Sequence, residues 1–203
     1  MIAKLRTIAV ALLSDQLHRN CGSVGLIPYH SPAPMVRTAV TVKTRGGDNL
    51  AILRAYDFCR PGDIMVVNAG GDISNAVVGG IMTLGAASLG LAGMVLDGAI
   101  RDLAEIRQRT FPVYARGVTH RGPYKDDPGA INVPITVGGM PVKAGDIIVG
   151  DQNGLLAFPP SLAATVIEKV LAQEQKEQST IDAIREGRWD RASIDALEAR
   201  CAN

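Results

Sequence analysis

Apolar and polar positions alternate in short blocks along the first third of the chain, and each block predicts one element. Residues 1–20 carry apolar side chains at helical spacing, which predicts one helix. Residues 35–44 alternate and are rich in Val and Thr, which is typical of a strand. The glycine-rich turn at 46–49 then leads into a predicted helix over 49–58.

The middle of the chain repeats this alternation. Apolar runs at 64–68, 94–96 and 112–117 predict strands. Between them, the glycine-rich loop 69–72 leads into a small-residue helix that ends near Gly90, and a short helix is expected around 102–109. Strands alternating with helices favour parallel pairing across crossover helices, and therefore an α/β class.

In the last third of the chain, predicted strands follow one another without helices between them. Two are expected at 131–137 and 147–150, and a hairpin follows. Asp151-Gln152-Asn153-Gly154 forms the tight turn that leads into a strand over 155–158. A final helix over about 161–187 follows two prolines and ends near Gly187. This helix turns polar after Leu171, so its outer half is expected to project from the domain and to pack on a neighbouring subunit.

Composition narrows the class of protein. The 203 residues suffice for one domain spanning 1–203, and 47% of them are hydrophobic but only 4% aromatic, so the core must be aliphatic. The 21 basic and 20 acidic residues give a net charge of +1, without the basic excess of a nucleic-acid binder. The apolar run at 8–13 is too short for a membrane span, and Cys21, Cys59 and Cys201 lack metal-type spacing. We therefore expect a cytoplasmic protein that binds neither nucleic acid nor membrane.

Two segments contain polar and glycine residues that a core alone does not require. The first runs over 68–82 and contains paired glycines at 70–71 and 79–80. Glycines allow a backbone to approach a ligand closely, and a helix that begins near Gly80 offers unpaired N–H groups that attract an anion. Tight packing between a strand and a helix would explain the same glycines, and this alternative remains open.

The second segment, residues 96–105, follows an apolar strand at its carboxyl end, where α/β folds place ligands. Asp102 offers a hard oxygen ligand for Mg²⁺ or Mn²⁺, and Arg101 offers a planar fork for carboxylate or enolate oxygens. A helix-capping Asp beside a surface Arg is the structural alternative. His18, His30 and His120 are too scattered to suggest a metal site.

The run GDIMVVNAGGDISNAVVGGIMTLGAASLGLAGMVLDGAIRD resembles the class II 4-hydroxy-4-methyl-2-oxoglutarate aldolase family, an RraA-like family that also contains regulators of ribonuclease E activity. The similarity covers about 36–158 and includes RTAVTVKTRGGDNLAI, FPVYARGVTHRGP and VGDQNGLLAFP. Its strongest signature is the spacing of Gly80, Arg101-Asp102 and Glu105, with twenty residues between the first two parts and two residues before Glu105. The resemblance implies a compact αββα-type sandwich, similar to the swivelling phosphohistidine-domain fold, that assembles as trimers or dimers of trimers.

The resemblance also implies roles for individual residues. Asp102 would hold the divalent cation, Mg²⁺ or Mn²⁺, largely through a shell of waters. Arg101 would contact the oxo and carboxylate oxygens of the substrate, and the backbone N–H groups of Ile81 and Met82 would receive its pyruvyl carboxylate. Glu177, from the C-terminal helix of a neighbouring subunit, would order the waters of the metal.

The chain departs from the family pattern at one position. Many members carry Asp where this chain has Gly80, which leaves Asp102 as the one expected direct ligand. Asp72 or Asn75 could compensate for the missing carboxylate. Gly79, Gly80 and Asn75 are accordingly expected to contribute to the substrate site.

These inferences predict a metal-dependent pyruvate aldolase that acts on a small 2-oxo acid. It would cleave 4-hydroxy-4-methyl-2-oxoglutarate, or a related 4-hydroxy-2-oxo acid, to pyruvate and a second oxo compound. Decarboxylation of oxaloacetate passes through the same enolate and is expected as a second activity. The competing prediction is a non-catalytic, protein-binding regulator, which Gly80 favours and which the retained Arg101, Asp102 and Glu105 disfavour.

Overall fold

The computed structural model describes residues 1–17, 19, 21–188 and 198, and its frame is one mixed β-sheet. The strands are β1 (Ile27–Pro28), β2 (Met35–Lys43), β3 (Ile64–Asn68), β4 (Ala76–Val78), β5 (Gly93–Ile100), β6 (Val113–Val118), β7 (Ala130–Ile131), β8 (Ile135–Val137), β9 (Met140–Val142), β10 (Ile147–Asp151) and β11 (Gly154–Phe158). The nine-stranded sheet has the order β1-β6-β5-β3-β2-β10-β11, with β4 beside β5 and β7 beside β2, while β8 and β9 form a separate hairpin. The predicted single-domain α/β class is confirmed.

The centre of the sheet is parallel. β2 pairs with β3, β3 with β5, and β5 with both β4 and β6, all in parallel register. The uninterrupted apolar runs of these strands suit burial on both faces, as in residues 64–67 of β3. Because the strands run in the same direction, their carboxyl ends meet at one edge of the sheet, and the loops that follow them lie together there.

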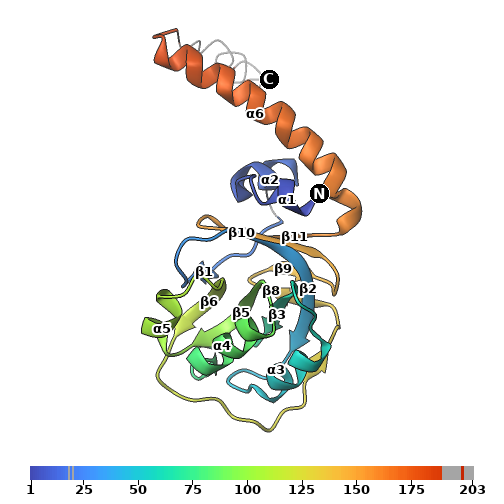
Figure 1. Ribbon diagram of the computed structural model, residues 1–203, viewed down its shortest axis with the longest axis vertical. Coiled ribbons are helices and arrows are strands. Elements are labelled where there is room, and N and C mark those ends of the chain that lie inside the picture. The colour runs from blue at the N-terminus through green and yellow to red at the C-terminus, as the bar shows by residue number, and fades with distance from the viewer. Residues whose placement is uncertain (18, 20, 189–197, 199–203) are drawn as a thin grey trace.

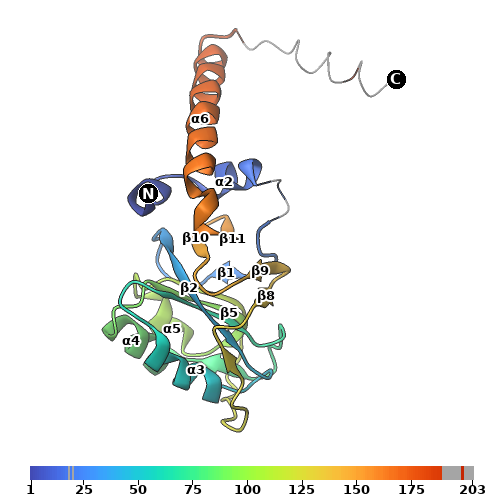
Figure 2. The same cartoon turned by 90° about the vertical axis from the view of Figure 1, so that its right-hand side faces the viewer.

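The helices fall into two groups (Figures 1 and 2). They are α1 (Ile2–Leu5), α2 (Val10–Gln16), α3 (Leu50–Ala55) with the 3₁₀ turn Tyr56–Phe58, α4 (Gly80–Ser88), α5 (Leu103–Arg107) and α6 (Ala163–Arg185), which follows the 3₁₀ turn Pro160–Leu162. α3, α4 and α5 cover the parallel part of the sheet, whereas α1, α2 and α6 gather beside the β10–β11 hairpin. There Leu5, Leu13, Phe158, Val166 and Val170 form a separate core cluster. Beyond it, α6 extends away from the body.

Several predicted elements are confirmed, among them β2, β3, β6 and the β10–β11 hairpin. The final helix ends as expected, with Gly187 at a φ of 72°, a left-handed value that glycine adopts freely. The single helix expected over 1–20 is wrong, because the chain breaks after α1 and restarts at Val10. The Val10 N–H bonds the Asp151 carboxylate at 2.9 Å, so a contact with the hairpin fixes the start of α2.

Several strands differ in length from the expected ones. β5 continues through Asp97 to Ile100 instead of ending at residue 96, because the Asp97 carboxylate finds partners inside the fold. It accepts hydrogen bonds from Arg116 Nε at 2.6 Å and from the Gly138 N–H at 2.9 Å. The strand expected over 131–137 is divided between β7 and β8, and β1, β4 and β9 have no counterpart among the expected strands.

His18 and Cys201 lie outside the described residues. Among the helices that the structure describes, none is both long and apolar enough to cross a membrane.

Candidate active site

The loops at the carboxyl ends of the parallel strands enclose a small cavity of about 50 Å³. Its lining comes from four segments far apart in sequence: Asn49, Val77, Val78, Gly79, Ile81, Met82, Arg101, Asp102 and Pro123. The fold therefore brings five of the predicted site residues into one lining: Gly79, Ile81, Met82, Arg101 and Asp102. Gly80 lies between two of them, at the start of α4.

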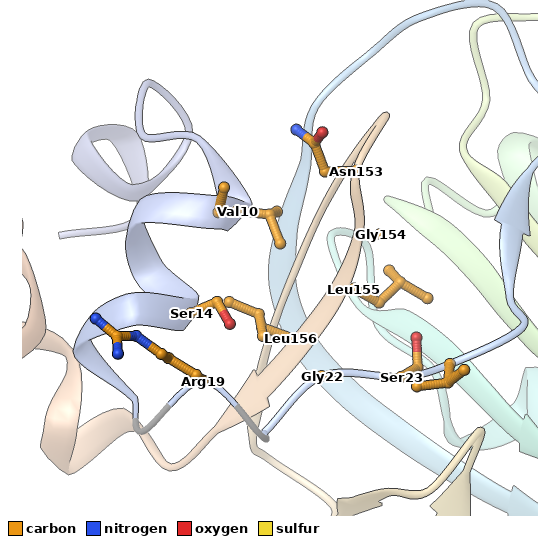
Figure 3. A pocket seen from close by; sticks show the side chains of 11 residues that line it. Val10, Ser14, Arg19, Gly22, Ser23, Asn153, Gly154, Leu155 and Leu156 are labelled. Carbon is orange, nitrogen blue, oxygen red and sulfur yellow. The ribbon is translucent and has the colours of Figure 1, made fainter. Parts of the chain in front are cut away.

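A larger cavity of about 410 Å³ lies between α2 and the β10–β11 hairpin (Figure 3). Its polar groups are mainly the neutral side chains of Ser14, Ser23 and Asn153. The one cation in its lining, Arg19, points away from the hollow and pairs with Asp15 at 3.2 Å. This lining includes no carboxylate, so size alone does not identify the reactive site.

Asp102 holds an unusual backbone position at the start of α5. Its φ of 60° and ψ of 41° lie in the left-handed region, which few non-glycine residues adopt and which often marks a functional site. It stands at the N-cap but makes no capping bond to α5. Instead, its Oδ2 accepts the Gly80 N–H at 2.9 Å and lies 3.9 Å from Arg101 Nε. The capping alternative is thus disfavoured, and the carboxylate faces the start of α4.

Charged side chains crowd the glycine pair at 79–80. A Cβ built on Gly79 would lie 2.5 Å from Asp102 Oδ2 and 3.0 Å from Arg101 Cγ. A Cβ built on Gly80 would collide with the carboxylate of Glu105. The space that a side chain at position 80 would need is therefore already taken by an acidic group from α5.

The first turn of α4 offers backbone donors to the cavity. The Gly80 N–H is engaged by Asp102, whereas the N–H groups of Ile81 and Met82 lie in the first turn, where no intrahelical acceptor exists. Ile81 is 86% exposed, so this turn is open to a ligand. The Tyr56 hydroxyl donates to the Met82 carbonyl at 2.8 Å, and burial raises the pKa of Tyr56 to about 12, so it stays a neutral donor.

Arg109 ties the two helices of the site together. Its Nη1 donates to the Gly80 carbonyl at 3.0 Å and to the Thr83 hydroxyl at 3.3 Å. Its Nη2 lies 3.5 Å from Glu105 Oε2. The guanidinium thus fixes the distance between the start of α4 and the carboxylate of Glu105.

Asn75 and Asp72 do not line the cavity. Asn75 Nδ2 donates to the Gly122 carbonyl at 2.6 Å and so holds the loop that carries Pro123. Asp72 Oδ1 accepts the Ser74 N–H at 2.8 Å, and this bond lowers the pKa of Asp72. The structure gives both side chains a role in shaping loops.

Glu177 lies on the outer half of α6, where its Oε1 accepts a hydrogen bond from Gln173 at 2.9 Å. α6 extends away from the body, at the opposite end from α4 and α5 (Figures 1 and 2). A single chain therefore does not bring Glu177 to the cavity.

Sequence reasoning missed Asn49, which follows β2 and lines the cavity. The signal was the polar pair Asp48-Asn49 directly before an apolar helix. Asp48 is fully buried and accepts the N–H groups of Leu50, Asp126 and Asp127 at 3.0, 2.8 and 3.1 Å. Burial alone would raise its pKa, but these bonds and nearby Arg45 lower the pKa of Asp48 overall. This buried carboxylate fixes the loop that presents Asn49.

The donor set suits a hard divalent cation. Within the described part of the chain, no three His, Cys, Asp or Glu side chains gather closely enough to form a complete metal site. Mg²⁺ needs no such cage, because it binds through one or two carboxylates and keeps several waters. Asp102, with Glu105 nearby, fits that requirement and does not fit a closed four-ligand zinc site.

Comparison with known proteins gives a consistent family assignment. The RraA-like family model, described as Aldolase/RraA, matches residues 10–157. A "putative 4-hydroxy-4-methyl-2-oxoglutarate aldolase" from Halalkalibacterium halodurans is 37% identical over 184 residues, which is 90% of this chain and 88% of that protein.

Two solved structures share the fold. An uncharacterised protein from Pseudomonas syringae pv. tomato aligns with a TM-score of 0.82 at 29% identity, covering 92% of this chain and 88% of that one. The "RNA-processing inhibitor RraA" of Thermus thermophilis aligns with a TM-score of 0.68 at 26% identity, covering 75% and 93%. With the signature residues gathered around one cavity and the family model matching most of its length, the chain belongs to the RraA-like, Aldolase/RraA family.

Proposed function

We propose that this protein is a divalent-metal-dependent pyruvate aldolase that uses Mg²⁺ or Mn²⁺. It would cleave 4-hydroxy-4-methyl-2-oxoglutarate, or a related 4-hydroxy-2-oxo acid, between C3 and C4. The observation that supports this most directly is the position of Arg101 and Asp102 beside the unpaired N–H groups of α4, in one small cavity. The name of the Halalkalibacterium halodurans relative points to the same chemistry.

In this proposal, the carboxylate and the 2-oxo oxygen of the pyruvyl group each have a partner. The N–H groups of Ile81 and Met82 accommodate its carboxylate at the positive end of the α4 dipole. The Arg101 side chain is 44% exposed, so its guanidinium can reach the 2-oxo oxygen while it stays beside Asp102. As the C3–C4 electron pair becomes the enolate, negative charge grows on that oxygen, and Arg101 stabilises it.

Asp102, with Glu105 beside it, would hold the divalent cation mainly through waters. When bound, the cation would supply Lewis acidity that stabilises the enolate. The C4 hydroxyl gives up its proton to a water, C4 becomes the carbonyl of the second product, and C3 later takes up a proton to give pyruvate. Oxaloacetate would yield the same enolate by losing CO₂, so its decarboxylation is part of the proposal.

The site is proposed to be completed by a second subunit, in a trimer or a dimer of trimers. Among the residues that the structure describes, the outer half of the helix that carries Glu177 has none that is buried, and Ile181 and Ile184 of that half are exposed. An acid that a single chain cannot bring to the cavity fits a role at the site of a neighbouring subunit, where it would order the waters of the metal.

The direct test is to incubate the purified protein with 4-hydroxy-4-methyl-2-oxoglutarate, and separately with oxaloacetate, and to follow pyruvate. We expect turnover with Mg²⁺ or Mn²⁺, loss of turnover in excess chelator, and recovery when the metal is restored. Absence of pyruvate from both substrates with either metal would reject the proposal. Full activity in excess chelator would reject its metal-dependent form.

The second candidate is a non-catalytic regulator that binds another protein. Gly80, in place of a carboxylate, and the structural likeness to an RNA-processing inhibitor favour it. A regulator does not need Arg101 and Asp102 to line one cavity, with the Glu105 carboxylate beside Gly80 at its edge. Pyruvate formation that depends on Asp102 therefore separates the two candidates.

A further inference from the structure

The amide of Asn49 is buried without a partner for its oxygen. The residue is 3% exposed and lines the cavity that contains Arg101 and Asp102. Its Oδ1 has no hydrogen-bond partner, and its Nδ2 meets only the sulfur of Met82, at 3.3 Å. Thioether sulfur is a weak acceptor, so neither end of this amide is well satisfied. Such groups in native structures call for an explanation.

A structural role does not explain this side chain. Asn49 stands at the N-cap of α3, a position that asparagine favours, but makes no side-chain capping bond. The capping bond to the Leu50 N–H comes from Asp48 instead. Rotating the amide by half a turn would place its oxygen on the Met82 sulfur, which donates nothing, so hydrogen bonding favours the observed orientation.

The amide of Asn49 also differs in its position from the other buried group without a partner. One further buried side-chain oxygen without a partner occurs in the described part of the chain, Ser23 Oγ. It lines the larger cavity beside α2, which holds no carboxylate. Asn49 Oδ1 is the one beside the reactive residues.

We propose that Asn49 is a positioning residue that holds the water to which the C4 hydroxyl gives its proton during aldol cleavage, an inference that rests on the proposed function. Oδ1 accepts one hydrogen of that water and leaves a lone pair of the water directed at the C4 hydroxyl. Met82, a flexible side chain, covers the amide in the free protein and moves aside when substrate enters.

The two proposed reactions differ in their need for this water. In aldol cleavage the C4 hydroxyl proton passes to the water, the C3–C4 electron pair becomes the enolate, and C4 becomes a carbonyl. In oxaloacetate decarboxylation the same bond breaks and CO₂ leaves, but C4 carries no hydroxyl and no proton is removed from it. Asn49 should therefore serve one reaction and not the other.

The test compares both reactions in the full-length, metal-loaded protein. Asn49→Leu keeps the side-chain size and removes the amide, and should lower kcat for aldol cleavage by about 100-fold, a typical contribution of proton transfer. Decarboxylation should change by less than about threefold by the same reasoning. Asn49→Asp, which restores an acceptor oxygen, should recover part of the aldol activity. Since Asn49→Leu removes an unsatisfied buried group, its Tm should not fall.

Thr44→Val is the matched control, because Thr44 is also buried and donates to the Asp48 carbonyl at 3.2 Å outside the cavity. It should affect both reactions alike. If Asn49→Leu lowers both reactions equally, or lowers the Tm as Thr44→Val does, Asn49 is structural and the inference is wrong. If the unmodified protein forms no pyruvate from either substrate, the proposed function itself fails.

Discussion

The two ends of this molecule are built on different principles. At the carboxyl edge of the parallel strands, charged and polar side chains are fixed by backbone groups. Asp102 accepts the Gly80 N–H, Arg109 donates to the Gly80 carbonyl, and Asp48 accepts three backbone N–H groups. At the opposite end, Ala163, Val166 and Val170 bury the first half of α6 through apolar contacts, and the helix then leaves the body.

This difference indicates how the proposed site divides between chains. The edge of the sheet supplies a preorganised half that binds the pyruvyl group and the cation. The outer half of α6 supplies an acid, Glu177, on a helix that is not fixed against its own chain. Preorganised groups stabilise a transition state without reorganisation, whereas a group on a projecting helix needs a neighbour to position it. The following predictions test this division.

The largest expected effect is at Asp102. Asp102→Ala removes the proposed metal ligand, so turnover should fall by at least about 1000-fold, given the part that metal ions and their polarised groups play in such reactions. The lost bond to the Gly80 N–H should cost about 1 kcal/mol of stability. Asp72→Ala is the matched control, since its carboxylate lies outside the cavity and should leave turnover near normal. Equal activity in the two variants would remove Asp102 from the mechanism.

The next effect is at Arg101. Arg101→Lys keeps the charge but loses the planar fork, and kcat should fall by about 100-fold, as for the loss of one oxyanion donor. The fall should appear in kcat and kcat/KM together, because the enolate charge exists only near the transition state. A change confined to KM would show that Arg101 binds substrate and transition state equally.

Asp48 should control the stability of the active-site edge. Asp48→Asn weakens a fully buried carboxylate network with Arg45 and three N–H groups, which should cost about 2–4 kcal/mol in unfolding free energy. The pKa of Asp48 is lowered in the folded state, so its contribution is complete above the ordinary carboxyl pKa of about 4 and is lost as the pH falls through the lowered value. When unfolding by denaturant is measured from pH 7 down to pH 2, the free energy of unfolding should therefore fall less in the variant than in the parent. Parallel pH curves would show that Asp48 does not titrate differently in the two states.

Truncation after Leu171 tests the other end. The buried residues of α6, at 163, 166 and 170, remain, so the domain should still fold. We expect fewer subunits in the assembly in solution. We also expect at least about a tenfold loss of turnover, because the acid from the neighbouring subunit is gone. Mass in solution and pyruvate formation should be measured on the same sample. A monomeric truncated protein with normal turnover would show that each chain holds a complete site.

The features that could be predicted from the sequence are those that depend on local residue pattern and on strand direction. β3 was placed at its observed bounds because an apolar run between turn signals has few alternatives. Arg101 and Asp102 were found because polar residues after a buried strand stand at the ligand-binding edge. The family resemblance added Ile81 and Met82, which the cavity lining brings to the same place.

The rest depended on contacts between distant segments. Asp97 was placed after its strand because its partner, Arg116, lies on another strand and pairs with it only in the fold. The polar pair Asp48-Asn49 marks the start of a helix, but an asparagine there is ordinarily a cap, and only the structure shows its oxygen unpaired. The partner of Glu177 belongs to a neighbouring chain in the proposal, so a single sequence carries no pattern for it.

The smallest expected effect, and the most specific test of the division between chains, is at Glu177. Glu177→Gln keeps the size of the side chain and its capacity to pair with Gln173, so assembly should match the parent in mass and stability. Only the charge that orders the waters of the metal is lost, and turnover should fall by about three- to tenfold, less than the loss of a direct oxyanion donor. Glu174→Gln, one turn away on the same helix, is the matched control and should stay within about twofold, as expected of a surface charge. If Glu174→Gln shows the larger loss of turnover, the acid is Glu174, and α6 lies one turn further along the neighbouring subunit than proposed. If neither variant changes turnover while truncation still does, the outer half of α6 contributes to assembly and not to the chemistry.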